Sequence, residues 1–287
     1  MSGLKEIRRR IASVKNTKQI TRAMKLVSAA KLRRAQQAAI GGRSFKEHLE
    51  KINSTVVQAL PENFAHPLLA KKEKVGTRRI VVIAGERGLC GAYNNNIFKE
   101  IQSQEIQKSI STEFVVIGRR AVSFANRMNW KTVVEYEGLS ENALNWPAEK
   151  MCEVLVNDFI LNKCDEIVIY YTKFISTLSQ KVMREVLLPF GDFSTDGENR
   201  QSVLSKFDPQ PEKILSYLLP LLVKTKLTQA GLEAKASEHA ARMTAMDSAT
   251  NNADDLISRL RLFYNRARQS TITRELIDIV GGAEAIK

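Results

Sequence analysis

The sequence predicts an α/β protein in which a long antiparallel two-helix coiled coil, formed by the N- and C-terminal helices, carries a central, mostly parallel sheet domain. Each end of the 287-residue chain has a long stretch whose apolar residues recur at helical spacing. The middle instead alternates short apolar runs with helix-like stretches. We therefore expect the paired helices at residues 1–60 and 211–287, the central domain at 75–190 and a connecting loop at 191–210.

The N-terminal stretch contains no proline up to residue 60. It opens with a heptad seam that steps by three and four residues, made of Leu4, Ile7, Ile11 and Val14. The apolar residues that follow are out of phase with this seam. We interpret them as a shifted seam, made of Ile20, Met24 and Val27 and then of Phe45, Leu49, Ile52 and Val56. The Gly41-Gly42 pair is expected to kink or loosen this helix.

The C-terminal stretch has a more regular period, and no proline follows Pro220. Because its steps of four and three continue unbroken, a left-handed supercoil is expected. The seam consists of Leu232, Ala236, His239, Met243, Met246, Thr250, Ala253, Ile257, Leu260, Tyr264 and Ala267. Neither terminal helix can bury its apolar stripe alone, so the two should pair antiparallel. The second helix, from about Pro211 to Val280, is longer, so the apolar stretch 272–286 should project beyond its partner.

The middle of the chain alternates predicted strands and helices. Strands are expected at 80–84, 114–117, 131–136 and 166–172, and helices at 94–107, up to about 127, and at 147–162. Strand–helix–strand order predicts a mostly parallel sheet covered by helices. Residues 178–187 alternate as a fifth strand, which is expected to join the sheet antiparallel.

Positive charge is concentrated at the N-terminus, within a formal net charge of +13. The first 34 residues hold eleven lysines and arginines, which only Glu6 opposes. Such a surface favours anionic partners, and one alternative is a basic coiled coil that binds nucleic acid. Another interpretation is a solvated helix face. Against nucleic acid, the basic residues are interleaved with an apolar seam that the C-terminal helix should cover.

No catalytic, cofactor-binding or metal-binding constellation is readable. The sequence GERGLCG at 85–91 follows the first strand, but its spacing is not the dinucleotide fingerprint, and the chain has no GxxxxGK[ST] loop. We interpret it as a tight turn, and a nucleotide-binding enzyme with helical arms is the alternative. The three histidines lack metal-ligand spacing.

Cysteine usage and hydropathy indicate the compartment. Cys90, Cys152 and Cys164 have no paired spacing, which argues against a disulfide framework and for a reducing compartment. The longest apolar run, 214–223, is half the roughly 20 residues that a membrane span needs. The N-terminus turns basic at once, unlike a signal peptide. We expect a soluble or peripheral protein.

Three segments of the sequence resemble the γ subunit of the F-type rotary ATP synthase. They read KEIRRRIASVKNTKQITRAMKLVSAAKLRRAQ at 5–36, ERGLCGAYNNNIF at 86–98, and SEHAARMTAMDSATNNADDLISRLRLFYNRARQSTITRELIDIVGGAEAI at 237–286. The resemblance implies a central shaft inside a ring of α and β subunits, which hold the nucleotide sites. It also implies contact with a small ε subunit and a membrane rotor ring. The expected place is the cytoplasmic face of the plasma membrane, with no cofactor and no nucleic acid.

The resemblance also assigns contact residues. Met24 and Lys25 match the shaft face that meets an acidic segment of a β subunit. Arg268 and Gln269 match positions that contact a β-subunit loop. Phe207 and Asp208 map near the foot that touches the rotor ring and the ε subunit. The cysteine pair of plastid members is absent, and the start at Met1 favours the bacterial type over the mitochondrial one.

Overall fold

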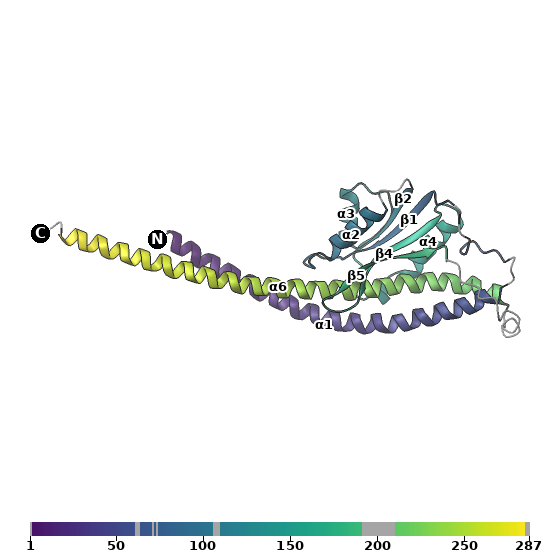
Figure 1. Cartoon of the computed structure of the whole chain (residues 1–287), viewed down its shortest axis with the longest axis horizontal. Helices are drawn as coiled ribbons and strands as arrows, with labels where there is room; N and C mark the ends of the chain where they lie inside the picture. The colour runs from purple at the N-terminus through teal and green to yellow at the C-terminus, as the bar shows by residue number, and fades with distance from the viewer. Residues whose placement is uncertain are drawn as a thin grey trace. The chain divides into compact units, whose positions relative to one another are not determined.

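A computed structural model of the chain describes residues 2–60, 64–70, 72, 74–105, 110–190 and 210–284. The chain divides into two compact units, and Figure 1 labels its helices and strands. The terminal unit is Met1–Ser28 with Arg242–Lys287, and the central unit is Ala29–Ala241. Two long helices contribute to both units: α1 runs from Ser2 to Gln58 and α6 from Pro211 to Glu284. None of the described helices combines the length and apolar content of a bilayer span.

The terminal unit is an antiparallel helix pair, as predicted. Partners on α6 move toward lower numbers as those on α1 move toward higher ones. Lys18 Nζ lies 2.5 Å from Asp254 Oδ1, and the Thr21 and Thr250 hydroxyls are 2.8 Å apart. Lys25 Nζ lies 2.5 Å from Asp247 Oδ1. The seam is therefore held by polar contacts as well as apolar packing.

The central unit contains a five-stranded sheet with the order β3-β2-β1-β4-β5. All neighbours are parallel except β5, which runs antiparallel to β4 as predicted. The strands are β1 (Thr77–Ile83), β2 (Ser111–Ile117), β3 (Thr132–Tyr136), β4 (Glu166–Phe174) and β5 (Gln180–Leu188). The helices between them are α2 (Tyr93–Gln104), α3 (Arg119–Arg127), the short 3-10 helix η1 (Ala143–Asn145) and α4 (Ala148–Ile160).

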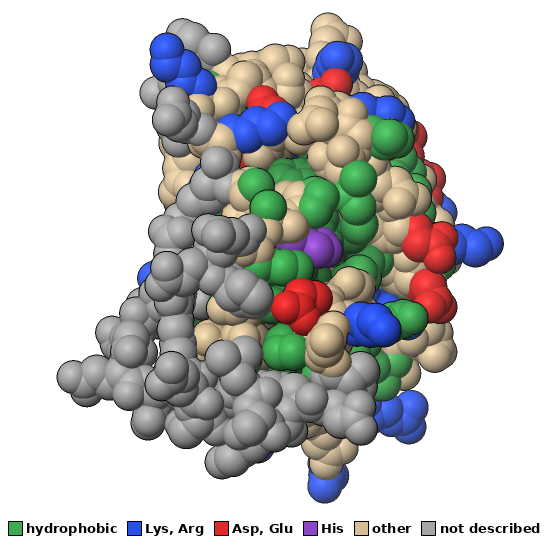
Figure 2. Space-filling view, turned by 90° about the vertical axis from the view of Figure 1, so that its right-hand side faces the viewer, with side chains coloured by type: hydrophobic (Ala, Val, Ile, Leu, Met, Phe, Trp, Pro, Cys, Tyr) green, Lys and Arg blue, Asp and Glu red, His purple; other side chains and the backbone are tan. Residues whose placement is uncertain are grey.

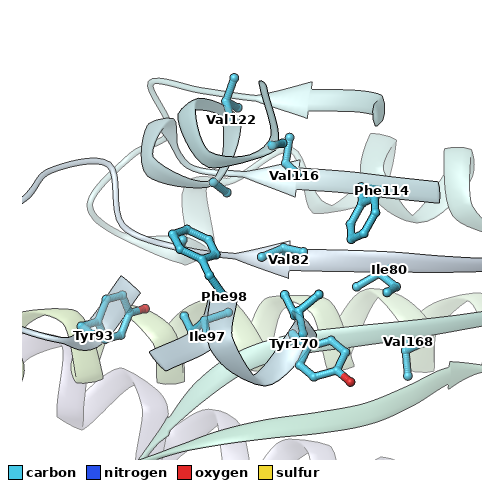
Figure 3. Close-up of a cluster of buried hydrophobic side chains, with 14 of the residues drawn as sticks. Ile80, Val82, Tyr93, Ile97, Phe98, Phe114, Val116, Val122, Val168 and Tyr170 are labelled. Atoms are coloured by element: carbon cyan, nitrogen blue, oxygen red, sulfur yellow. The ribbon is translucent and has the colours of Figure 1, made fainter. Parts of the chain in front are cut away.

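One face of the sheet packs against α2 and α3. Alternate strand residues, among them Ile80, Val82 and Val116, turn to this face because side chains along a strand point to opposite sides. They meet Ile97 and Phe98 of α2 in a buried apolar cluster (Figure 3). Burying these apolar side chains stabilises the sheet domain.

The opposite face receives α4 and the two long helices. The connections from β1 to β2 and from β2 to β3 run in one direction across the sheet, and the connection from β3 to β4 runs in the other. Because parallel crossovers are right-handed, this reversal places α4 on the face opposite α2 and α3. Arg79 of β1 accordingly reaches Asp158 of α4. The Cys152 thiol of α4 donates to the Pro220 carbonyl of α6 at 3.3 Å. The long helices are therefore one layer of the sheet domain as well as a coiled coil.

The predicted shift in the seam of α1 is wrong. Ile20 and Val27 are 60% and 56% exposed, whereas Thr21 and Ser28 are buried. The seam keeps the phase of its first heptads and passes through polar residues, so the apolar pattern alone could not follow it. Phe45 and Ile52, also assigned to the seam, are likewise exposed, while Leu49 and Val56 are buried.

The other expectations for the long helices are confirmed where the described residues test them. Every predicted seam residue of α6, from Leu232 to Ala267, is buried or half-buried. The apolar residues near the end of α6 are exposed: Ile272, Leu276, Ile277, Ile279 and Val280. Gly41 and Gly42, by contrast, do not interrupt α1.

Candidate functional site

Met24 and Lys25 lie on α1 in the terminal unit, and both are half-buried. The Lys25 ammonium pairs with Asp247, and the two side chains are 39% and 46% exposed. A partner that approaches here therefore meets an existing ion pair beside a thioether. This ion pair could not be predicted from the sequence, because Lys25 and Asp247 are 222 residues apart along the chain.

Arg268 and Gln269 lie on the part of α6 that belongs to the terminal unit, and both are exposed. Among the described residues, none bonds the Arg268 guanidinium. The backbone carbonyl of Gln269 accepts a hydrogen bond from the Thr273 hydroxyl at 2.9 Å. The planar guanidinium is thus available for a bidentate contact with a partner's carboxylate or carbonyl groups.

Met24 with Lys25, and Arg268 with Gln269, lie on the paired helices of the terminal unit but at different positions along the helix axis. Lys25 lies opposite Asp247, and Arg268 follows Asp247 by 21 residues on α6. At 1.5 Å per residue this corresponds to about 30 Å along the helix. The two pairs would therefore meet different segments of a surrounding protein. Phe207 and Asp208 lie outside the described residues.

The terminal unit also exposes large apolar side chains away from its seam. On α1 these are Ile20, Leu26 and Val27, and on α6 they include Leu262 and Phe263, each 61% exposed. Exposed apolar side chains bind a protein partner where they form a contiguous patch. Sequence reasoning missed those on α1 because it assigned Ile20 and Val27 to the seam. Extending the phase set by Leu4 and Ile7 would have found them.

The GERGLCG segment is a tight turn, as interpreted. Leu89 and Gly91 adopt left-handed backbone conformations, with φ of 61° and 58°. The Glu86 carboxylate accepts the backbone N–H of Arg119, the first residue of α3, at 3.3 Å. It also accepts the N–H of Leu139 at 3.2 Å. The Glu86 carboxylate thus caps the N-terminus of α3 and ties the turn to the loop after β3.

The topological switch point of the sheet, between β1 and β4, is filled by α6. Doubly wound sheets bind ligands at this position, beyond the carboxyl ends of the strands. Here the Ser237 hydroxyl donates to the Thr172 carbonyl at 2.9 Å, and Glu233 accepts the Phe174 N–H at 3.0 Å. Tyr93, at the start of α2, donates its hydroxyl hydrogen to the Ala234 carbonyl at 3.1 Å. This packing weighs against the nucleotide-binding enzyme.

The cysteines and His239 are packed inside the central unit. Burial raises the pKa of both Cys152 and Cys164 to about 11, so their thiols are poor nucleophiles at neutral pH. His239 is 2% exposed, and its Nε2 lies 3.2 Å from Glu141 Oε2. Lys31 approaches the same carboxylate at 3.0 Å. No group of three potential metal ligands occurs among the described residues.

Charge on the described surface is partly neutralised. Three of the eleven N-terminal cations are paired with carboxylates: Lys18 with Asp254, Lys25 with Asp247 and Lys31 with Glu141. Figure 2 shows a face on which apolar side chains gather while positive and negative ones are scattered around them. The predicted coverage of the α1 seam by α6 is confirmed by the buried Thr21–Thr250 contact. These observations favour protein partners over nucleic acid.

Comparison with known proteins gives one consistent result. A family model described as ATP synthase matches residues 3–286. The ATP synthase gamma chain of Pelotomaculum thermopropionicum is 38% identical over 287 residues, and that of Halothermothrix orenii 40% identical over 289, each alignment covering all of both chains. A chain in a Euglena gracilis mitochondrial ATP synthase structure is similar in fold, with a TM-score of 0.72 and 19% identity over 99% of this chain and 95% of that one. A chain in a Tetrahymena thermophila mitochondrial ATP synthase central-stalk structure gives a TM-score of 0.62 and 22% identity, covering 80% and 99%.

Proposed function

The chain belongs to the ATP synthase gamma chain family, as the central-stalk subunit of an F-type ATP synthase, and from this premise we propose that it transmits torque between a membrane ion-translocating ring and a catalytic head of α and β subunits. The observation that carries the proposal is the terminal unit. Its two antiparallel helices bury a partly polar seam between them and expose apolar side chains outward. Such a rod can fit inside a ring of other subunits and present a different surface to each.

The chain itself supplies contacts rather than chemistry in this proposal. The filled switch point supports a role without a nucleotide site of its own. The catalytic head would hold three copies each of the α and β subunits. The ε subunit and the rotor ring would bind this chain at the end away from the head. Membership of the complex would keep the chain on the cytoplasmic face of the plasma membrane. The chain's contacts with the catalytic head would also regulate ATP hydrolysis. Nucleic-acid binding finds no support in the family match.

We assign four residues to the contact with the catalytic head. Met24 and the Lys25–Asp247 pair present a mixed apolar and charged surface to an acidic β-subunit segment. Arg268 and Gln269 contact a β-subunit loop at a second level, about 30 Å away at 1.5 Å per residue. Phe207 and Asp208 are proposed to contact the rotor ring or the ε subunit.

The double variant Arg268→Ala with Gln269→Ala tests this assignment in the assembled complex. Both side chains are exposed, so the variant should fold and assemble with normal amounts of α and β subunits. Losing a charge-assisted contact of about 1.5–3 kcal/mol should lower ATP synthesis by about tenfold or more. Each single variant is measured as well, because neighbouring substitutions can couple.

Arg119→Ala is the matched control, since Arg119 is an exposed arginine of the sheet domain. It should leave ATP synthesis at the wild-type rate. Unchanged synthesis in the double variant would remove the assigned contact. Purification of the wild-type chain without α and β subunits would overturn the proposed function as a whole.

A further inference from the structure

The last residues of β4 extend beyond the strand beside them. Pairing between β1 and β4 runs from Arg78 with Glu166 to Val82 with Tyr170 and then stops. β4 continues for four residues to Phe174. Backbone N–H and C=O groups in a buried strand require partners. β5 still pairs with these four residues on one edge of β4, so the backbone groups on the other edge must find partners other than β1.

Side chains from the two long helices supply these partners. Ser237 of α6 donates to the Thr172 carbonyl at 2.9 Å. Glu233 of α6 accepts the Phe174 N–H at 3.0 Å, and Arg43 of α1 donates its Nη2–H to the Phe174 carbonyl at 2.5 Å. The helix pair thus takes the place of the missing stretch of β1.

Glu233 is the centre of this arrangement. Its side chain is only 2% exposed, and its two oxygens accept Arg43 Nε at 2.5 Å and Nη2 at 2.7 Å. Gln229 donates to the same carboxylate at 3.0 Å and also to the Ala39 carbonyl of α1 at 3.0 Å. The hydrogen bond with Glu233 raises the pKa of Arg43. One carboxylate therefore joins α1, α6 and β4.

We propose that the Arg43–Glu233 pair is the joint through which the sheet domain and the paired helices pass torque to each other. This inference rests on the proposed function. Apolar packing is non-directional, so it resists separation of two layers more than it resists their sliding. A buried bidentate pair that also holds a strand end fixes orientation, because its bonds are lost when the layers turn. Glu233 and Arg43 are positioning residues in this proposal and take no part in the chemistry.

Two other contacts between the sheet domain and the long helices are less directional. Glu185 of β5 meets Lys46 at 2.8 Å and Lys226 at 3.2 Å, but each ammonium is a single-point charge on a flexible stem. The Trp146 ring packs against Gly231 of α6 so closely that a Cβ at this glycine would lie 2.7 Å from the ring. This contact is apolar. These contacts add stability, and the guanidinium–carboxylate pair adds the angular constraint.

The experiment replaces Glu233 with glutamine in the full ATP synthase and measures ions pumped per ATP hydrolysed in inverted membrane vesicles, normalised to assembled heads. Glu105→Gln is the matched control. Glu105 is equally buried and pairs with Arg78 and Arg184, all within the sheet domain. A variant that is merely less stable should lower the amount of assembled complex and leave ions per ATP unchanged. We expect Glu233→Gln to lower ions per ATP by at least about twofold and Glu105→Gln to leave it at the wild-type value.

Arg43→Lys provides a second variant in case Glu233→Gln fails to assemble. It keeps the charge pair between the helices but removes the forked geometry that reaches Phe174. It should therefore assemble and still lower ions per ATP. Wild-type coupling in Glu233→Gln or in Arg43→Lys, or an equal loss in Glu105→Gln, would overturn the joint. A wild-type complex that lacks this chain would instead overturn the proposed function, so the two failures are distinguishable.

Discussion

Gly42 lies where α1 and α6 approach too closely for a larger residue. A Cβ at Gly42 would lie 2.0 Å from Gln229 Oε1 and 3.1 Å from Leu232 Cδ1. Gln229 cannot move away freely, because it is buried and bonded to Ala39 and Glu233. At the neighbouring Gly41, a Cβ would meet nothing within 4 Å. The helix packing therefore requires a glycine at position 42 but not at position 41.

This difference predicts opposite effects of alanine at the two positions. Gly42→Ala should lower the free energy of unfolding of the purified chain by about 1–3 kcal/mol, through forced displacement of Gln229. Gly41→Ala should raise it by about 0.5–1 kcal/mol, because alanine favours the helix. Denaturant unfolding followed by circular dichroism measures both, and a shift of the same sign in the two variants would contradict the account.

At the scale of elements, β1 is anchored to both helical layers by two consecutive buried arginines. Arg78 pairs at 2.5 Å with Glu105, the residue that follows α2, and contacts Glu166 of β4. Arg79 turns to the other face and pairs with Glu113 at 2.7 Å and with Asp158 of α4. The sequence prediction began this strand at residue 80, because arginines normally indicate a solvated surface.

These pairs predict a loss of stability in acid. Burial alone would raise the pKa of Glu105, but hydrogen bonds from Arg184, Tyr170 and Arg78 outweigh it and hold the pKa below its ordinary 4.5. The pKa of Glu113 is lowered for the same reason, since bonds from Lys131 and Arg79 outweigh its burial. A carboxyl whose pKa is lower in the folded state stabilises it fully above the unfolded value, and this stabilisation is lost as pH falls.

The midpoint of denaturant unfolding should therefore fall steadily below about pH 4.5. Glu105→Gln should be less stable at pH 7, and its midpoint should fall less on acidification. An unfolding midpoint that rises as the pH is lowered through this range would contradict the argument.

The long helices show which elements can be predicted from sequence. The strands and α6 were found because their apolar patterns are continuous along the chain. The α1 seam was lost after Val14, because its next positions are Lys18, Thr21 and Lys25, whose partners lie more than 220 residues away. Polar seam residues carry no local signal, so only the pairing with α6 identifies them.

At the scale of the whole molecule, fold and family followed from sequence, but the joint between the layers did not. Arg43, Phe174 and Glu233 come from three distant segments, and none of them stands in a recognisable motif. Their association depends on β4 extending past β1, which strand prediction cannot resolve to single residues. The contact residues Met24, Lys25, Arg268 and Gln269 came from the resemblance and remain predictions.

Rotation of this chain inside the assembled head tests the central claim most directly. The three native cysteines are buried, so Glu137→Cys on an exposed loop of the sheet domain offers a single reactive thiol for an optical probe. With the head fixed to a surface through its β subunits, ATP should turn the probe continuously in one direction. A head that hydrolyses ATP at the normal rate while the probe stays still would contradict the account.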